Sequence, residues 1–310
     1  MPWVPPYRRL RKALAVGKIC DRVETMPPTP PVVLTIAGFD PSSGAGVTAD
    51  IKTIAAQGCY GLACITALTV QSTAGVRRTE AVAPALVRET LEELARDISI
   101  AAVHIGMLAN QAVAMEVAGF LDKHPLPNVV LDPVLRSSSG AVLLEPKGAA
   151  VLLERLLPRA AVITPNIDEA AHLAGLTVTN PGEMKLAAER LHDMGAANVV
   201  VTGGHLDKAI DVLGFTTPQG TFEFEVFQSP RLETTSTHGT GCAFATALAC
   251  HLAQGRSLPE GVLLTKAYVA AAIANAHPLG QGHGPVHHLY RMSEPARQRA
   301  RAEAVPVDHD

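Results

Sequence analysis

The residues with the clearest potential for chemistry lie in the segment STHGTGCAFATALACHL, at positions 236–252. Small and glycine residues lead into Cys242, and an alanine-rich apolar run follows at once, which predicts a glycine loop that opens a helix. Successive amides at a helix N-terminus bind anions such as phosphate, and glycines let the backbone approach such a ligand closely. The loop around Gly239, Thr240 and Gly241 is therefore a candidate anion site.

The thiol of Cys242 is the most reactive side chain of this loop. The positive end of a helix favours a thiolate and lowers the pKa of a thiol, so we expect Cys242 to act as a base beside a bound phosphate. A cysteine hydrolase would use the same group differently, and a buried structural cysteine is the plain alternative. Cys250, two turns further along, is interpreted as such a structural cysteine.

A second glycine loop, AGFDPSSGAGVTAD, occupies positions 37–50. Its spacing satisfies the dinucleotide fingerprint G-x-G-x-x-G/A. However, residues 38–43 separate the first glycine of the fingerprint, Gly44, from the expected strand. In addition, the next strand ends at Gln71 and not at an acidic residue. An NAD site is therefore not favoured. Asp40 and Asp50 flank the turn at the end of a sheet where open α/β folds bind ligands, which favours a substrate loop over a glycine turn that merely starts a helix.

From position 32 onward, short apolar runs alternate with helical patterns. Strands are predicted at 32–37, 62–70, 101–106, 128–134, 160–166 and 198–204, a hairpin at 211–227, and helices at 46–58, after Cys242 and from about 258 to 277. In the first helix, the face expected to be buried carries Val47, Ile51, Ile54 and Ala55. The alternation predicts an α/β fold with a mostly parallel sheet and helices on both faces.

Composition limits the classes of function. Of 310 residues, 47% are hydrophobic and 18% are charged, and the net charge is -3, which favours a folded core and no nucleic-acid or membrane partner. Five cysteines without a C-x-x-C pair suit a cytoplasmic protein. Residues 1–31 are interpreted as a disordered extension in preference to a targeting peptide. The predicted organisation is this extension, one domain at 32–290 and a C-terminal tail at 291–310.

Nine motifs occur in one order: TIAGFDPSSGAG, ADIKTIAAQGCYG, ITALTVQST, IGML, LDPV, ITPN-x-x-EA, GGH, STHGTGC and GHGPVHH. Together they resemble the hydroxymethylpyrimidine/phosphomethylpyrimidine kinases of thiamine biosynthesis, a family of the ribokinase-like superfamily. The resemblance implies a ribokinase-like three-layer α/β sandwich that uses ATP and Mg²⁺. The implied reaction phosphorylates 4-amino-5-hydroxymethyl-2-methylpyrimidine to its monophosphate and then to its diphosphate. Family members are often homodimers, which implies a homodimer here.

The resemblance also implies roles in phosphate transfer. Cys242 would help to deprotonate the hydroxymethyl group of the substrate, and the amides of residues 239–241 would stabilise the γ-phosphate. Asn166 would lie near the phosphates, and Asp132 and Glu169 would position Mg²⁺, partly through water. Without the family, Asn166 and Glu169 fit a simple capping box at the start of a helix.

For the substrate, the resemblance implies a pyrimidine pocket formed by Gly38, Asp50, Gln71, Met107 and Val134. The carboxamide of Gln71 offers both a donor and an acceptor to a ring edge. A polar strand end facing water is the alternative for Gln71, and core packing is the alternative for Met107. The histidines of GHGPVHH do not suit a metal site, because Gly284 and Pro285 prevent a helix there.

Three positions depart from the family pattern. Thr202, near the ATP phosphates, and Ser138 stand where lysine is usual, and Phe39 stands where a small hydroxyl residue is common. These changes bear on rate, on substrate range and on the second phosphorylation. Two other functions fit the same chain: a pyridoxine or pyridoxal kinase, whose substrate is also a flat heteroaromatic ring with a hydroxymethyl group, and a catalytically silent pyrimidine-binding sensor.

Overall fold

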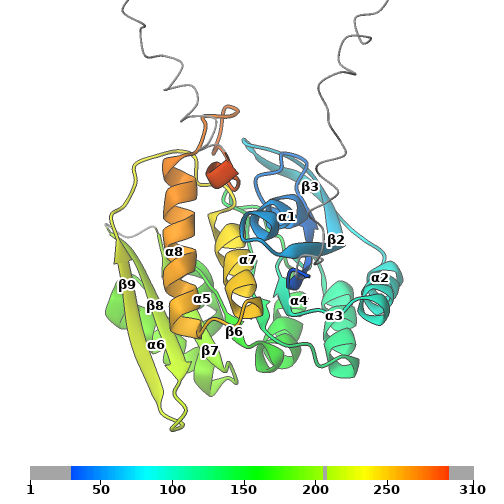
Figure 1. Ribbon diagram of the computed structural model, residues 1–310, viewed down its shortest axis with the longest axis horizontal. Helices are drawn as coiled ribbons and strands as arrows, with labels where there is room; N and C mark the ends of the chain where they lie inside the picture. Colours follow the sequence, from blue (N-terminus) through cyan, green and yellow to red (C-terminus); the bar gives the residue numbers. More distant parts are fainter. Residues whose placement is uncertain (1–28, 205–207, 293–310) are drawn as a thin grey trace, which may run out of the picture. The chain divides into compact units, whose positions relative to one another are not determined.

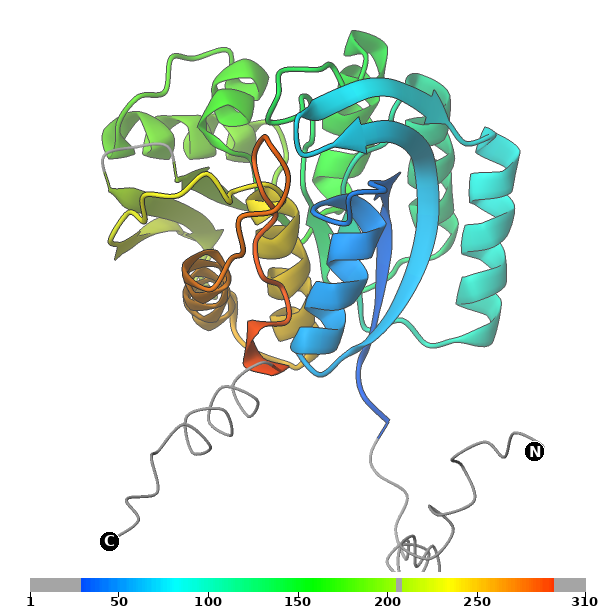
Figure 2. The same ribbon diagram turned by 90° about the horizontal axis from the view of Figure 1, so that it is seen from above.

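The computed structural model describes residues 29–204 and 208–292. Within them, the chain forms a nine-stranded sheet in the order β3-β2-β1-β4-β5-β6-β7-β8-β9, with helices on both faces (Figures 1 and 2). Residues 1–28 of the predicted extension and residues 293–310 of the predicted tail lie outside the described part of the chain.

Parallel strands form the middle of the sheet, as predicted. They are β2 (Tyr60–Ser72), β1 (Val32–Phe39), β4 (Ala102–Ile105), β5 (Val129–Leu131), β6 (Val162–Ile163) and β7 (Asn198–Gly203). The predicted hairpin is confirmed as β8 (Ala209–Thr216) and β9 (Phe222–Ser229), antiparallel beside β7. The edge strand β3 (Gly75–Ala81) was not predicted; it pairs antiparallel with β2, and its charged, incompletely buried side chains give no apolar alternation.

Two helical layers bury the sheet. One contains α1 (Gly46–Ala56), α7 (Thr240–Ala253) and α8 (Leu258–Ala274), and the other contains α2 (Pro84–Asp97), α3 (Gln111–Lys123), α4 (Pro146–Val151), α5 (Ile167–Ala174) and α6 (Pro181–Asp193). A π turn (Leu152–Leu156) and a 3₁₀ turn (Leu157–Arg159) continue α4. In β1, Leu34 and Ile36 pack into the core beside α2 and α3, whereas Val33 packs beside α7. Burial on both faces explains why the strands are continuously apolar.

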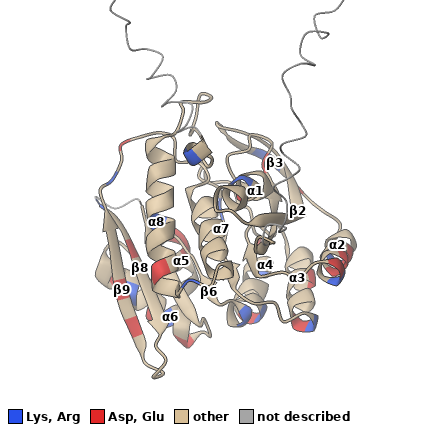
Figure 3. Ribbon diagram, in the orientation of Figure 1, with Lys and Arg blue, Asp and Glu red and all other residues tan. Residues whose placement is uncertain are grey.

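Helix α7 lies at the centre of its layer. It packs on α1, α8 and strands β1, β4 and β5, and it carries no Lys, Arg, Asp or Glu (Figure 3). Residues 243–251 are all buried, so apolar packing fixes the N-terminus of the helix, where Cys242 lies. Among the described helices, none is long and hydrophobic enough to cross a membrane.

The buried face of α1 differs from the prediction. Val47 and Ile54 are buried as expected, but Ile51 is 37% exposed and Ala55 is also exposed. Asp50 lies on the buried face instead, because two buried threonine hydroxyls donate hydrogen bonds to its carboxylate. A hydrophobic pattern cannot reveal a polar residue whose burial depends on partners from other elements.

Candidate active site

A cavity of about 830 Å³ lies at the edge of the sheet where the parallel strands end. Its wall is formed by residues that follow β1, β4, β5 and β6, by the end of β2 and by the start of α7. Eleven of the thirteen predicted site residues line it: Gly38, Gln71, Met107, Asp132, Val134, Asn166, Glu169, Gly239, Thr240, Gly241 and Cys242. Asp50 and Thr202 do not line it.

The two glycine loops pack directly against each other beside this cavity. Gly239 has a φ of +82°, and a Cβ there would lie 1.8 Å from the carbonyl oxygen of Gly44. A Cβ on Gly44 would in turn lie 2.2 Å from Cδ2 of His238. Glycine is therefore required at both positions for the contact between the loops, which accounts for Gly44 in the loop at 37–50 without a dinucleotide.

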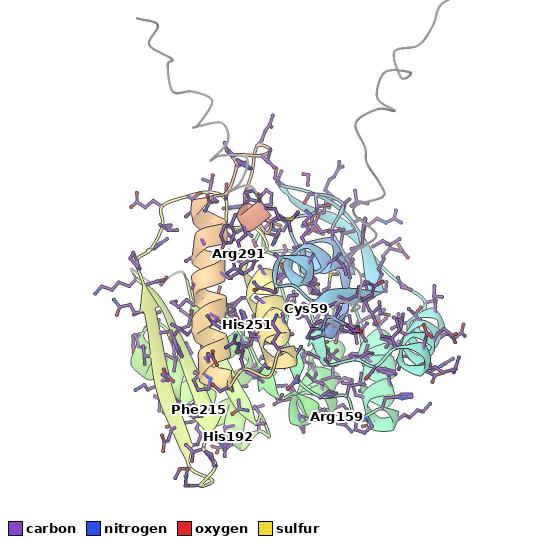
Figure 4. All side chains as sticks on the ribbon, viewed as in Figure 1. Cys59, Arg159, His192, Phe215, His251 and Arg291 are labelled. Atoms are coloured by element: carbon purple, nitrogen blue, oxygen red, sulfur yellow. The ribbon has the colours of Figure 1, made fainter. Side chains whose placement is uncertain are left out.

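Cys242 differs from the other described cysteines because it is only partly buried and lines the cavity. Cys59, which lies after the end of α1, is buried and accepts a hydrogen bond from Gln254 (Figure 4). The predicted lowering of the Cys242 pKa is wrong for the protein's own groups. Burial, and then the charges of Asp132 and Asp50, raise its pKa well above the usual value. Burial and the carboxylates together outweigh the positive end of α7, so the thiol stays protonated unless positive charge enters the site.

Asp132 and Glu169 are two buried carboxyl groups on the cavity wall. A Cβ on Gly241 would lie 4.0 Å from Oδ2 of Asp132, so this carboxylate lies beside the anion loop. Burial raises the pKa of Asp132 to about 6. Burial, followed by repulsion from Asp132, raises the pKa of Glu169 to about 8. The two groups disfavour each other's charge, and a bound cation would relieve that repulsion.

This pair fits Mg²⁺ by its chemistry. Mg²⁺ takes oxygen ligands, keeps several waters and is commonly held by one or two carboxylates together with phosphate oxygens. Across residues 29–204 and 208–292, no group of three or more His, Cys, Asp or Glu side chains is suited to a metal ion. At a pair of carboxylates, phosphate oxygens and water would complete the coordination of Mg²⁺. The capping box at the start of α5 holds Glu169 in place: Asn166 N–H donates to its Oε2 at 3.0 Å, and its own N–H donates to Asn166 Oδ1 at 2.9 Å.

Asp50 lies behind the cavity in a fully buried cluster with Thr35, His104 and Thr246. Its carboxylate accepts hydrogen bonds from Thr35 Oγ1 at 2.6 Å and from Thr246 Oγ1 at 2.8 Å, and His104 Nδ1 lies 3.3 Å from its Oδ2. Burial alone would lower the pKa of His104, but the charge and hydrogen bond of Asp50, with a contribution from Asp132, raise it. The geometry therefore favours a supporting role for Asp50 over the predicted contact with the substrate.

A hydrogen-bonded chain reaches Gln71 from Asp40 in the glycine loop at 37–50. His238 Nε2 lies 2.8 Å from Asp40 Oδ2 and 3.2 Å from the Gln71 carboxamide. An imidazole N–H that donates to Asp40 has no lone pair left to accept from an amide nitrogen. We therefore assign the Gln71 carboxamide with its oxygen toward His238 and its nitrogen toward Thr69 Oγ1. This chain fixes the orientation of the Gln71 amide at the cavity wall.

The GHGPVHH segment, for which the sequence suggests no role, holds His238 in place. The backbone N–H of His238 donates to the carbonyl of Gly284 at 3.0 Å. A Cβ on Gly282 would lie 2.1 Å from the carbonyl oxygen of Thr73, in the turn between β2 and β3. The segment thus connects that turn with the anion loop, and its His283 lines the cavity.

Comparison with known proteins identifies the family of the chain. The family model described as Phosphomethylpyrimidine kinase matches residues 40–287. The chain belongs to this family. The Hydroxymethylpyrimidine/phosphomethylpyrimidine kinase of Haemophilus influenzae is 40% identical over 257 residues, which cover 83% of this chain and 96% of the relative. The Thiamine biosynthesis bifunctional protein ThiED of Geobacter sulfurreducens is 43% identical over 272 residues, 86% of this chain, and the chain spans 54% of that longer protein.

Solved structures of kinases share the fold. The ADP complex of Bacillus subtilis pyridoxal kinase superposes with a TM-score of 0.77 at 34% identity, covering 85% of this chain and 100% of that chain. The phosphomethylpyrimidine kinase of Clostridium difficile gives a TM-score of 0.69 at 37% identity, covering 78% and 99%. The predicted ribokinase-like α/β fold is confirmed.

The kinase differs from its family pattern at positions that the structure now locates. Thr202 pairs with Asn166 through a β-bridge but does not line the cavity. Lys266 of α8 reaches β8 beside Thr202, but its ammonium lies 2.7 Å from the carboxylate of Asp211 in a buried ion pair. Ser138 and Phe39 both line the cavity, so these two departures bear directly on what the cavity holds.

Besides His283, sequence reasoning missed four charged or titratable side chains of the kinase cavity: Arg136, Asp168, His172 and His238. Each lies within three positions of a predicted site residue. His172, for example, follows Glu169 by three residues in α5, a spacing that places two side chains on one helix face. Adjacency to a motif is the signal that would have found them.

Proposed function

We propose that this kinase transfers the γ-phosphate of ATP to 4-amino-5-hydroxymethyl-2-methylpyrimidine and then to the resulting monophosphate, in thiamine biosynthesis. The observation that supports the proposal is that an anion loop, a thiol, two buried carboxyl groups and an oriented carboxamide line one cavity. Phosphoryl transfer to a hydroxymethyl pyrimidine requires an anion site, a base, a cation site and polar groups for a ring edge. The relatives' names point to the same reaction.

On the phosphate side, the N–H groups of residues 239–241 and the positive end of α7 would stabilise charge on the transferring phosphoryl group. Asp132 and Glu169 would hold Mg²⁺, which supplies positive charge to the phosphate oxygens when it is bound. The carboxamide of Asn166 lines the same part of the cavity and would donate to phosphate.

The raised pKa of Cys242 explains how it would serve as the base. A thiolate with a high pKa accepts protons strongly, but it forms only where the negative charges around it are compensated. Positive charge at Asp132 and Glu169 provides this compensation, and the N-terminus of α7 then favours the thiolate. The proton of the substrate hydroxyl would pass to Cys242 Sγ as the hydroxyl oxygen attacks the γ-phosphorus, while the bond from that phosphorus to the β,γ-bridging oxygen breaks and ADP leaves.

On the substrate side, the oriented carboxamide of Gln71 would bind the aminopyrimidine edge, with Met107 and Val134 against the ring. Gly38 supports this reading, because a Cβ there would lie 2.8 Å from Met107 Sδ. The absence of a side chain at Gly38 therefore leaves the Met107 side chain in its position on the cavity wall. A volume of about 830 Å³ lies within the range of small-molecule sites, about 300–1,000 Å³.

Pyridoxal kinase activity is the second candidate function. It is favoured by the similarity to Bacillus subtilis pyridoxal kinase at 34% identity. Pyridoxal also presents a hydroxymethyl group on a flat ring, so Cys242 and the anion loop would serve it equally. The two candidates differ at the ring edge, where only the pyrimidine carries an amino group for Gln71.

Phosphorus NMR of the purified protein with ATP, Mg²⁺ and each acceptor tests both candidates. The pyrimidine should give monophosphate and then diphosphate signals. Cys242→Ala should lower kcat by about 10²–10⁴-fold with ATP binding retained, whereas Cys59→Ala removes a thiol outside the cavity and should keep wild-type kcat. Phosphorylation of pyridoxal alone would select the second candidate, and binding of the pyrimidine without any phosphorylated product would reject both in favour of a sensor.

The homodimer, the cytoplasmic location and the domain organisation belong to the same proposal. Analytical ultracentrifugation should find a two-chain species, and cell fractionation should find the protein with cytoplasmic enzymes. Limited proteolysis should remove residues 1–31 and 291–310 and leave a kinase domain at 32–290.

A further inference from the structure

The cavity has an unbalanced charge for a site that binds phosphates. Four acidic side chains line it: Asp40, Asp132, Asp168 and Glu169. In the described part of the chain, Arg136 is the one Lys or Arg on its wall. ATP and a phosphorylated acceptor bring several further negative charges into the same space. One Mg²⁺ at Asp132 and Glu169 would be largely neutralised by those two carboxylates, so a permanent cation is needed in addition.

Arg136 lies on a short hairpin that starts four residues after Asp132. The N–H of Leu143 donates to the carbonyl of Leu135 at 2.9 Å, a β-bridge pairs Arg136 with Val142, and the turn closes at Gly140. These bonds make the hairpin a defined structural element, and the backbone N–H of Leu135 donates to the carboxyl group of Glu169. The Cα of Arg136 is therefore held near Glu169 while its side chain stays exposed.

The guanidinium of Arg136 is not committed to a protein carboxylate. It donates one hydrogen bond, from Nη1 to the carbonyl of Gly140 at 3.2 Å, and within the described residues no carboxylate lies within ion-pair distance of it. Arg155 and Arg159, in contrast, both pair with Asp122. A neutral carbonyl contact at an exposed site is weak compared with a bidentate contact to phosphate.

Other cations near the site already have partners. Lys266, beside Thr202, is ion-paired with Asp211, and the ammonium of Lys52 donates to the carbonyl of Ser43 at 2.8 Å and does not line the cavity. Moving Lys266 would leave Asp211 buried without a counter-charge, which is strongly unfavourable. Neither lysine therefore substitutes for a cation on the cavity wall.

We propose that Arg136 is the phosphate-binding cation of this kinase. Its guanidinium leaves the carbonyl of Gly140 and contacts the terminal phosphate oxygens of the bound nucleotide, where it stabilises charge during transfer. The inference rests on the proposed kinase function of the cavity, but it does not depend on which ring compound accepts the phosphate. A planar guanidinium with several N–H donors suits phosphate better than a single ammonium.

Binding of the non-hydrolysable analogue β,γ-methylene-ATP in the presence of Mg²⁺ tests the proposal directly. Since hydrogen bonds to charged groups are each worth about 1.5–3 kcal/mol, Arg136→Gln should weaken binding of the analogue about 10–100-fold. Binding of adenosine should not change, because it lacks phosphates. Arg136→Lys should show an intermediate loss, and kcat/KM for ATP should fall at least as much as binding.

A relocated cation provides the decisive variant. Ser138 lies two residues further along the hairpin and also lines the cavity, so the double variant R136Q/S138K returns a positive charge to the same space. It should recover part of the affinity for the analogue. Arg78→Gln is the matched control, because Arg78 is exposed, pairs with Glu80 and lies outside the cavity; it should bind the analogue like the wild type.

Two results would overturn the proposal: Arg136→Gln binding the analogue as tightly as the wild type, or adenosine and the analogue losing affinity equally, which would indicate a damaged hairpin. If neither pyrimidine nor pyridoxal is phosphorylated while the Arg136→Gln loss is specific to the triphosphate, the proposed function fails and the assignment of Arg136 stands.

Discussion

The Glu169→Gln variant is expected to be more stable than the wild type, by a margin that grows as the pH rises, although the substitution removes a carboxyl group from the cavity. Burial and the neighbouring Asp132 raise the pKa of Glu169 from its usual 4.5 to about 8. The folded state therefore binds this proton more tightly than the unfolded chain, and wild-type stability falls as the pH rises from 4.5 to 8. Each pKa unit corresponds to about 1.4 kcal/mol, so the loss reaches about 3 kcal/mol at pH 7 and about 5 kcal/mol above pH 8.

Glutamine carries no charge and keeps an oxygen that can accept from the N–H of Asn166, so the variant should escape this loss while the capping box survives. Urea unfolding of both proteins between pH 5 and pH 9 measures the difference in the free energy of unfolding, which should grow steadily in favour of the variant. Mg²⁺ should stabilise the wild type more than the variant at pH 8. Kinase activity should fall, because a metal-positioning group is lost.

Glu183→Gln is a matched control of opposite sign. Glu183 also stands three residues after a capping asparagine, Asn180, but in the exposed first turn of α6. Hydrogen bonds from the side chain and backbone of Thr179 lower the pKa of Glu183. Its carboxylate therefore stabilises the folded protein at pH values above the usual pKa of glutamate, and the Glu183→Gln variant should lose this stability in that pH range. If the Glu169→Gln difference stays flat between pH 5 and pH 9, Glu169 carries no burial penalty and the electrostatic account of the site is wrong.

Two further substitutions test the support behind the cavity and the contact between the loops. Asp50→Asn should lower the free energy of unfolding by about 3–5 kcal/mol, because it leaves His104 without the buried charge that faces it. Chemical denaturation measures this free energy. A loss below about 1 kcal/mol would contradict the buried pair. Gly239→Ala should lower kcat/KM for ATP at least tenfold, because its Cβ would lie 1.8 Å from the Gly44 carbonyl oxygen at a φ of +82°. A loss of about 1.4 kcal/mol of transition-state stabilisation, caused by the displaced loop, suffices for a tenfold effect. Wild-type kinetics would show that the two loops do not need this contact.

The parts of the site that could be predicted are those with a local signal. The anion loop is specified by glycines next to an apolar helix, and both α7 and its partly exposed Cys242 are found where that pattern places them. The parallel strands are predictable for the same reason, because burial on both faces leaves continuous apolar runs. The capping box of α5 is also local, since Asn166 and Glu169 are three residues apart.

The parts that could not be predicted depend on contacts between distant segments. The carboxylate of Asp50 is satisfied by Thr246, 196 positions away in the sequence, so its burial has no signature in α1 itself. The chain from Asp40 through His238 to Gln71 likewise joins two loops and the end of β2. Edge strand β3 was missed because a charged, exposed strand lacks apolar alternation.

The predicted pKa of Cys242 failed for a reason that bears on mechanism. Helix position alone favours a thiolate, but burial, and then the charges of Asp132 and Asp50, raise the pKa of Cys242 and reverse the effect. The carboxylates that would hold the cation are thus among the groups that suppress the proposed base, so occupancy of the cation site and formation of the thiolate would be coupled. A thiolate present at all times would also deprotonate water beside bound ATP and promote hydrolysis without an acceptor. In the proposed mechanism, suppression of the base until the nucleotide and its cation are bound would protect ATP, and it would follow from the charges of this cavity without any movement of the fold.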